Sequence, residues 1–301
     1  METWFWIFGW SLSLLTITGN GFIIFLVCRR RRLQTKTNAF VVSLAVADVC
    51  VGLSTVPPLF VCEKTTGCDP EVPFANRVDY LRWLFMYASV TNLCSLVLDR
   101  YFAVVQPLKY LLFMTRKRVS QIIFLSWALS ILLVSPDVLI WLALNDNRSL
   151  FLIFSWIIMT FVEFLPSCGL IFCFGSMVQV VYKHERAARI LAKQLHFNHR
   201  YLFKNAEKSA VKVMGIVIGL FLVCSACSLR CSLIYIMKEE RPCKDKKFKL
   251  PLLILNSAIN PVAYALFKRD IKEEAKRRTC CVIWKKRNNI EPLNDLQFFS
   301  K

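Results

Sequence analysis

Charged residues and histidines are scarce in this sequence. Charged side chains make up 20% of the 301 residues, and only three residues are histidine. His184, His196 and His199 lie close together in a segment that offers no partnered nucleophile, so the sequence does not support a hydrolytic enzyme. Internal repeats, low-complexity tracts and linkers long enough to separate domains are also lacking, which indicates one domain.

Apolar residues are in excess. Hydrophobic residues make up 56% of the chain and the mean hydropathy is +0.47, whereas soluble domains are usually about 45–50% apolar. Windows of about 19 residues locate apolar runs long enough to cross a bilayer as helices, at about 3–28, 39–62, 78–105, 119–141, 150–181, 207–237 and 248–267. The first run has no basic leader and stops at the arginines of 29–32, so a retained helix is expected rather than a signal peptide. The sequence therefore predicts an all-α membrane protein built as a seven-transmembrane helix bundle.

Acidic residues are few, with 20 Asp and Glu against 39 Lys and Arg and a net charge of +19. Most basic residues fall after the first, third, fifth and seventh runs, so the positive-inside rule places those segments in the cytosol and the N-terminus outside. Charge confined to one side indicates solvated flanks and contact with anionic membrane lipids, not nucleic acid. The membrane domain is expected at 1–281, with a short amphipathic surface helix at 268–278 and a short cytosolic tail at 282–301.

The third run ends in Asp99-Arg100-Tyr101, and charges at the end of a membrane helix need a partner. Neighbouring residues on a helix do not face each other, so Asp99 is expected to satisfy Arg100 only in part, and Glu207 is the candidate second acid. With Pro107 six residues after the tyrosine, this stretch resembles the end of the third helix in rhodopsin-like (class A) G-protein-coupled receptors. The resemblance implies that Asp99, Arg100, Tyr101 and Glu207 form an ionic lock on the surface that couples to the G protein.

Further motifs carry the resemblance, which covers about residues 10–281 and identifies the chain as a divergent member. They are Gly19-Asn20 in the first run, Asp48 in the second, Trp127 in the fourth, Pro166 in the fifth, and Asn256-Ser257 with Asn260-Pro261-x-x-Tyr264 in the seventh. The resemblance implies that an activation switch is formed by Asn260, Pro261, Tyr264 and Phe221.

A carboxylate in the middle of an apolar span is costly, so Asp48 is a candidate functional residue. In the family, this acid binds a sodium ion, and the partners implied here are Ser89, Asn256, Ser257 and Asn260, which can offer oxygen to a hard cation. The alternative is a protonated or water-bound Asp48. An allosteric sodium ion is the one cofactor expected.

The resemblance implies a receptor of the plasma membrane, multi-pass, with an extracellular N-terminus, and not an enzyme. An extracellular small-molecule or peptide ligand is expected to activate a heterotrimeric G protein, with arrestin and membrane lipids as further partners. The alternative is a non-signalling seven-helix scaffold or a transporter, although transporters usually show a repeat symmetry that this sequence lacks.

Two departures from the family pattern are expected to matter. The Cys that the family carries at the head of the third helix is here Ala75, so the outer disulfide must use other cysteines, namely Cys62, Cys68 and Cys243, with Cys231 as a less favoured fourth. The family's Cys-Trp-x-Pro in the sixth helix is here Cys224-Ser225-Ala226-Cys227, and without the proline this helix should bend less.

Candidate ligand-binding residues lie near the outer ends of the third, fifth and sixth runs: Asp79, Arg82, Trp83, Glu163 and Arg230. Amine receptors carry an acid eighteen residues before the Arg100 position, where this chain has Arg82, so an aminergic ligand is disfavoured. Arg82 is expected either to bind an acidic or carbonyl-bearing ligand or to pair with Asp79 at i,i+3, and Glu163 is either a pocket acid or a partner of Arg82. A retinal ligand is disfavoured because Ile254 stands where opsins carry the Schiff-base lysine.

Two kinds of modification are expected. Cys280 and Cys281 follow the predicted surface helix and are candidates for palmitoylation. Asn147 begins an Asn-Arg-Ser glycosylation sequon in the short loop after the fourth run.

Overall fold

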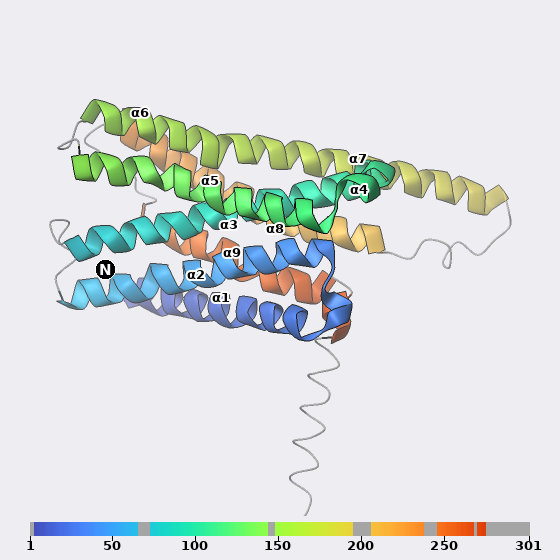
Figure 1. The fold of residues 1–301 in the computed structure, drawn as a ribbon, viewed down its shortest axis with the longest axis horizontal. Helices are drawn as coiled ribbons and strands as arrows, with labels where there is room; N and C mark the ends of the chain where they lie inside the picture. The colour runs from blue at the N-terminus through green and yellow to red at the C-terminus, as the bar shows by residue number, and fades with distance from the viewer. Residues whose placement is uncertain are drawn as a thin grey trace, which may run out of the picture.

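The computed structural model describes residues 3–65, 73–143, 148–194, 206–237, 246–267 and 270–274. Within these residues the chain forms helices and short connections, with no strand. Six helices are long and apolar enough to cross a membrane, and a shorter apolar helix spans Leu250–Tyr264. The long helices lie side by side as one bundle (Figure 1), so the predicted all-α, seven-helix membrane fold is confirmed.

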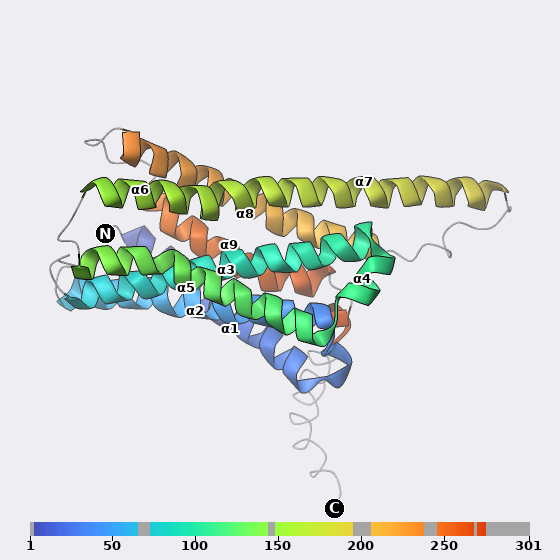
Figure 2. The ribbon, with the colours of Figure 1, turned by 45° about the horizontal axis from the view of Figure 1, so that its top comes forward.

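The membrane helices follow the seven predicted runs closely. They are α1 (Thr3–Arg29), α2 (Lys36–Thr65), α3 (Pro73–Val105), α5 (Arg116–Ala143), the continuous series α6 (Arg148–Ile158), η2 (Met159–Phe164) and α7 (Leu165–Gln194), then α8 (Ala206–Met237) and α9 (Lys246–Phe267). The fifth membrane helix is longer than its predicted run, which ends at about residue 181. In the structure α7 continues to Gln194 and extends past the other helices in both ribbon views (Figures 1 and 2).

The distribution of polar side chains suits a lipid environment. Phe124, Leu132 and Phe172 are more than half exposed on the outer faces of the bundle, whereas Asp48 and Asn92 are fully buried inside it. In lipid, apolar side chains can face outward at no cost, and polar side chains must find partners between the helices. The bundle is therefore apolar outside and partly polar within.

Close helix contacts occur where the sequence has glycine. A Cβ atom on Gly19 would lie 3.1 Å from the side chain of Pro261, so glycine lets α1 approach α9 at the proline. The amide nitrogen of Asn20 donates to the carbonyl oxygens of Thr16 (3.0 Å) and, across the interface, Ser257 (3.1 Å). These contacts join α1 to the proline-containing part of α9.

Two short helices were not predicted: η1 (Arg31–Leu33) and α4 (Pro107–Phe113). Residues 270–274, within the predicted surface helix, are helical, and Ile271 is fully buried against the bundle. Glu274 accepts a hydrogen bond from Nε of Arg30 at 2.5 Å, which ties this segment to the end of α1. Cys280, Cys281 and the predicted tail at 282–301 lie outside the described residues, as does Asn147.

Candidate functional site

The first candidate site lies at the end of α3, where Asp99 and Arg100 form an ion pair. The Nε and Nη2 atoms of Arg100 donate to Oδ2 of Asp99 at 3.0 and 2.6 Å. Asp99 is fully buried, whereas the side chain of Arg100 is 22% exposed. Asp99 thus holds the guanidinium more completely than the sequence predicted.

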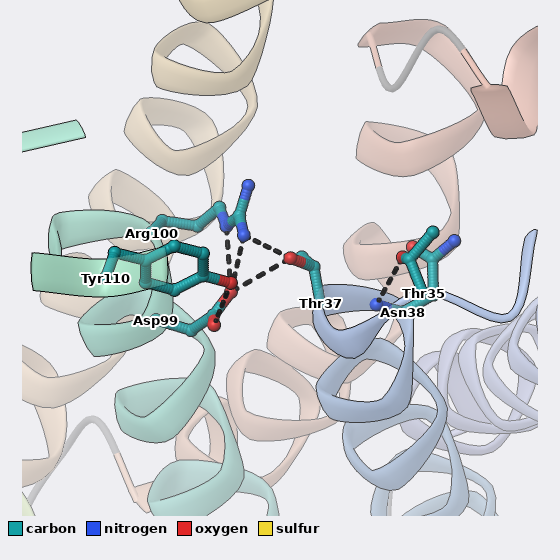
Figure 3. A network of polar contacts seen from close by, with 6 residues as sticks. All are labelled: Thr35, Thr37, Asn38, Asp99, Arg100 and Tyr110. Carbon is teal, nitrogen blue, oxygen red and sulfur yellow. Dashed lines mark hydrogen bonds and ion pairs between the residues drawn. The ribbon is translucent and has the colours of Figure 1, made fainter. Parts of the chain in front are cut away.

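Two residues from other helices complete this pair. The hydroxyl of Thr37, in the first turn of α2, donates to Oδ2 of Asp99 at 3.1 Å and accepts a hydrogen bond from Nη2 of Arg100. The hydroxyl of Tyr110, in α4, donates to Oδ1 of Asp99 at 2.9 Å. Figure 3 shows these four side chains pointing toward one another. We refer to Thr37, Asp99, Arg100 and Tyr110 as the cytosolic network.

The neighbouring backbone positions Thr37 and Tyr110. Oγ1 of Thr35 accepts a hydrogen bond from the backbone N–H of Asn38 at 3.2 Å and so caps the first turn of α2 (Figure 3). Pro107 is the first residue of α4, where its missing N–H costs no helical hydrogen bond. Burial, together with the charge of Asp99, raises the pKa of the Tyr110 hydroxyl, which therefore stays protonated and remains a donor.

Tyr101, another member of the predicted lock, makes aromatic contacts instead of joining this network. The ring of Tyr101 packs edge-on against Phe102 and at 6.2 Å from the ring of Phe172 in α7. Glu207 lies in the first turn of α8, but its side chain is outside the described part of the structure. The second partner of Arg100 in the described residues is therefore the Thr37 hydroxyl, which the sequence analysis missed.

The second candidate site surrounds Asp48, which α2 buries completely against α3 and α9. Ser89 donates to Oδ1 of Asp48 at 2.6 Å, Asn260 donates to Oδ2 at 2.8 Å, and Ser257 lies within hydrogen-bonding reach. The Oδ1 atoms of Asn256 and Asn260 are buried and have no hydrogen-bond partner among the described residues. One carboxylate and two unpartnered amide oxygens form a donor set that fits a hard cation such as sodium.

The predicted activation residues lie beside this site. Tyr264 is 1% exposed, and its hydroxyl has no hydrogen-bond partner among the described residues. Phe221 is 3% exposed and packs in the main apolar core. Pro261 continues α9 without ending it.

The third candidate site contains the charged residues predicted to bind the ligand, beginning with Arg82 and Asp79 on α3. Nη2 of Arg82 lies 2.7 Å from Oδ1 of Asp79 in an i,i+3 pair, in which the side chain of Arg82 is 7% exposed and that of Asp79 is 51% exposed. Nε and Nη1 of Arg82 are buried without a hydrogen-bond partner among the described residues. The Arg82 guanidinium also lies 5.8 Å from the centroid of the Trp83 ring.

Glu163 lies in the π-helical segment η2, and Arg230 is exposed on α8. Oε1 of Glu163 accepts a hydrogen bond from Ser228 of α8 at 2.5 Å. Trp83 and Glu163 line a cavity of about 50 Å³ between α3, η2, α8 and α9, which the other three predicted pocket residues do not line. The ion pair of Arg82 is made with Asp79, so the structure does not place Glu163 as its partner.

Cys231 is disulfide-bonded, although the sequence favours Cys62, Cys68 and Cys243 over it as disulfide candidates. The side chains of Cys62, Cys68 and Cys243 lie outside the described residues. The sequence favours cysteines in loops as disulfide candidates, and Cys231 lies within an apolar helix, where nothing in the sequence marks it as disulfide-bonded.

The seven-helix bundle, with a buried polar interior and a charged cluster at one end of α3, is that of a multi-pass membrane protein. Residues 19–264 match the family described as 7 transmembrane receptor (rhodopsin family), and the chain belongs to this family. It is therefore a G-protein-coupled receptor that responds to an extracellular ligand, a signalling protein rather than an enzyme.

Similar proteins include receptors for different kinds of ligand. The chain is 30% identical over 283 residues to the histamine H2 receptor of Canis lupus familiaris, covering 87% of this chain and 75% of that receptor. It is 26% identical over 290 residues to the neuropeptide S receptor of Mus musculus, covering 89% and 77%. It is also 26% identical over 311 residues to the octopamine receptor beta-2R of Chilo suppressalis, covering 90% and 78%.

Proposed function

We propose that this receptor acts in the plasma membrane with its N-terminus outside, and that ligand binding releases the cytosolic network so that a heterotrimeric G protein can bind. The observation that supports this is the set of contacts of Arg100, which is held by Asp99 and Thr37 from two helices. A ligand shifts such an equilibrium when it binds the released state more tightly. Arrestin is a further proposed partner at the same surface.

Measuring G-protein activation in cells that express the receptor, against a broad panel of small molecules and peptides, tests this function. We expect at least one class of compound to activate the receptor, and Arg100→Ala to abolish that response at equal surface expression. A response that survives Arg100→Ala would show that the cytosolic network is not the coupling element.

We propose that Glu207 completes the resting lock on Arg100. A second acid near one guanidinium offsets its desolvation better than one acid alone. Glu207→Ala is therefore expected to raise ligand-independent signalling, measured against wild type at matched surface expression. Glu185→Ala, which removes an acid from α7, is the control, and unchanged basal signalling in Glu207→Ala would remove this residue from the lock.

We also propose that Asp48, Ser89, Asn256, Ser257 and Asn260 bind a sodium ion in the resting state. The proposal is supported by the buried carboxylate and by the amide oxygens that lack partners. These residues would hold the ion between α2, α3 and α9 and so favour the resting packing of these helices.

By linkage, an ion bound only in the resting state should stabilise the ligand-free receptor and lower agonist affinity. The unfolding temperature of the purified receptor is expected to be higher in sodium chloride than in equimolar potassium chloride, and Asp48→Asn should remove this difference. Ser43→Ala, which loses a buried hydroxyl bonded to Asn92 instead, should retain it. Equal sodium sensitivity in wild type and Asp48→Asn would refute the site.

For the ligand, we propose that Arg82 binds a carboxylate, phosphate or carbonyl group, with Asp79, Trp83 and Arg230 on the same outer halves of α3 and α8. The proposal is supported by the two buried N–H groups of Arg82 that lack partners, since such donors are costly unless a ligand satisfies them. An amine that requires an acid at the Arg82 position is disfavoured.

We further propose palmitoylation at Cys280 and Cys281 and glycosylation at Asn147.

A further inference from the structure

The cavity between α3, η2, α8 and α9 extends inward from the outer charged residues. Its lining includes Trp83 and Glu163, and also Ser89 and Ser257, which contact Asp48. Ser225 of α8 also lines the cavity and is 8% exposed. Serine is much smaller than the tryptophan that the family pattern has at this place, so it leaves more room between the helices.

The polar lining of this cavity includes two strong hydrogen-bond acceptors, and Ser228, which also lines it, donates to Oε1 of one of them. Glu163 contributes a carboxylate, and Asn256, which is 7% exposed, contributes an Oδ1 atom that has no hydrogen-bond partner among the described residues. Cys224 also lines the cavity, but its thiol already donates to the carbonyl oxygen of Leu252. None of the described residues that line the cavity is Lys, Arg or His.

The remaining lining is largely apolar and aromatic. The rings of Trp83 and Tyr87 have centroids 6.0 Å apart, and Phe221 closes the cavity toward the core. Aromatic faces attract cations, and a buried carboxylate favours a positive group over a neutral one. The Oδ1 atom of Asn256 is a buried acceptor without a donor among the described residues, which is costly, so the cavity is complementary to a compact group with N–H donors.

We propose that this cavity is a second, deeper ligand subsite that takes a small ammonium or amidinium group between Glu163 and Asn256, in competition with the sodium ion proposed for the resting state, which uses the same Oδ1 atom of Asn256. Arg82 does not line the cavity, so this subsite has the opposite charge preference to the outer one. The inference rests on the proposed receptor function only in placing the group within the ligand pocket. The carboxylate that attracts it is supplied by η2, not by α3.

Charged thiol reagents test this preference without a known ligand. In the full-length receptor with Cys224→Ala and Cys227→Ala, a Ser225→Cys variant places one thiol on the cavity wall. The probes are cationic 2-aminoethyl methanethiosulfonate and anionic 2-sulfonatoethyl methanethiosulfonate, and their rates of modification are measured by mass spectrometry of the peptide. Each rate is divided by the rate of the same reagent with free cysteine.

We expect the cationic reagent to react at least tenfold faster than the anionic one after this normalisation. Glu163→Gln should reduce the preference to within threefold of unity, whereas Glu274→Gln, which neutralises an acid that pairs with Arg30 and does not line the cavity, should leave it unchanged. If Ser225→Cys is not recovered as folded receptor, native Cys224 in a Cys227→Ala background gives the same comparison.

Equal rates for both reagents, a preference for the anion, or a cation preference that survives Glu163→Gln would overturn the proposal. Failure of both reagents to modify the cavity thiol would overturn it as well. Because the measurement involves no G protein, a failure of the subsite is distinguishable from a failure of the proposed signalling function.

Discussion

Replacing Asp99 with asparagine should raise ligand-independent G-protein signalling at least fivefold at equal surface expression. The Asp99 carboxylate accepts hydrogen bonds from Arg100, Thr37 and Tyr110 and is fully buried. Asparagine has one acceptor oxygen and no charge. Its NH2 group would face donor groups whose hydrogen bonds the carboxylate now accepts. The resting position of Arg100 would lose its main anchor.

The size of this effect follows from the burial of the pair. Removing one partner of a fully buried ion pair costs about 3–5 kcal/mol, and water recovers part of this cost because the Arg100 side chain is 22% exposed. A residual shift of about 1 kcal/mol changes an equilibrium roughly fivefold. A cell-based assay of basal G-protein activation, normalised to receptor at the surface, measures the change.

Two matched variants separate the charge from the rest of the network. Thr37→Val and Tyr110→Phe each remove one hydroxyl and keep the shape and the charge of the pair, so each should raise basal signalling less than Asp99→Asn. Equal effects from all three variants would mean that the hydroxyls matter as much as the charge. Unchanged basal signalling in Asp99→Asn would show that this pair does not hold the resting state.

The membrane helices could be predicted because their cause is local: each is an apolar run of bilayer length. The Asp48 cluster could be predicted only through the resemblance, since Asp48 and Asn260 meet across two helices far apart in the chain. Thr37 and Tyr110 could not be predicted, because a threonine and a tyrosine near helix ends are common and carry no spacing signal. Their role depends on how α2 and α4 pack against the end of α3.

The helix ends were harder to predict than the helices. The apolar run marks the fifth span only to about residue 181, whereas α7 continues to Gln194 through a basic, amphipathic segment that could equally have been an extension of the helix or a separate contact segment. The π-helical segment η2 also left no mark in the sequence, although it carries Glu163. Such segments occur often at functional sites, and here one presents an acid to the cavity.

The two candidate acids of the outer pocket have different partners. Asp79 pairs with Arg82 on one helix, whereas Glu163 accepts a hydrogen bond from Ser228 and lines the cavity. Charges separated in this way suit a ligand that carries an acceptor at one end and a donor at the other. Such a ligand carries both kinds of group, unlike a simple amine or a simple acid.

Arg82→Met is expected to raise the unfolding temperature of the ligand-free receptor by several degrees while lowering agonist potency tenfold or more. Two buried N–H groups of Arg82 have no partner among the described residues, and each such group costs about 1–3 kcal/mol. Methionine fills a similar volume without polar atoms. Asp79, left behind, has a side chain that is 51% exposed and stays hydrated, so its loss of a partner costs little.

The same substitution separates a ligand-binding Arg82 from a purely structural one. A hydrogen bond from a charged group contributes about 1.5–3 kcal/mol, so its loss lowers potency by tenfold or more, since tenfold corresponds to about 1.4 kcal/mol. Unfolding is followed by intrinsic fluorescence at one heating rate, and potency is measured with an agonist from the panel, with Asp79→Asn as the control for the ion pair. A structural ion pair predicts the opposite result: a lower unfolding temperature in Arg82→Met, a similar loss in Asp79→Asn, and unchanged potency in both. A receptor that trades stability for recognition at this residue should instead become more stable and less responsive in the same variant.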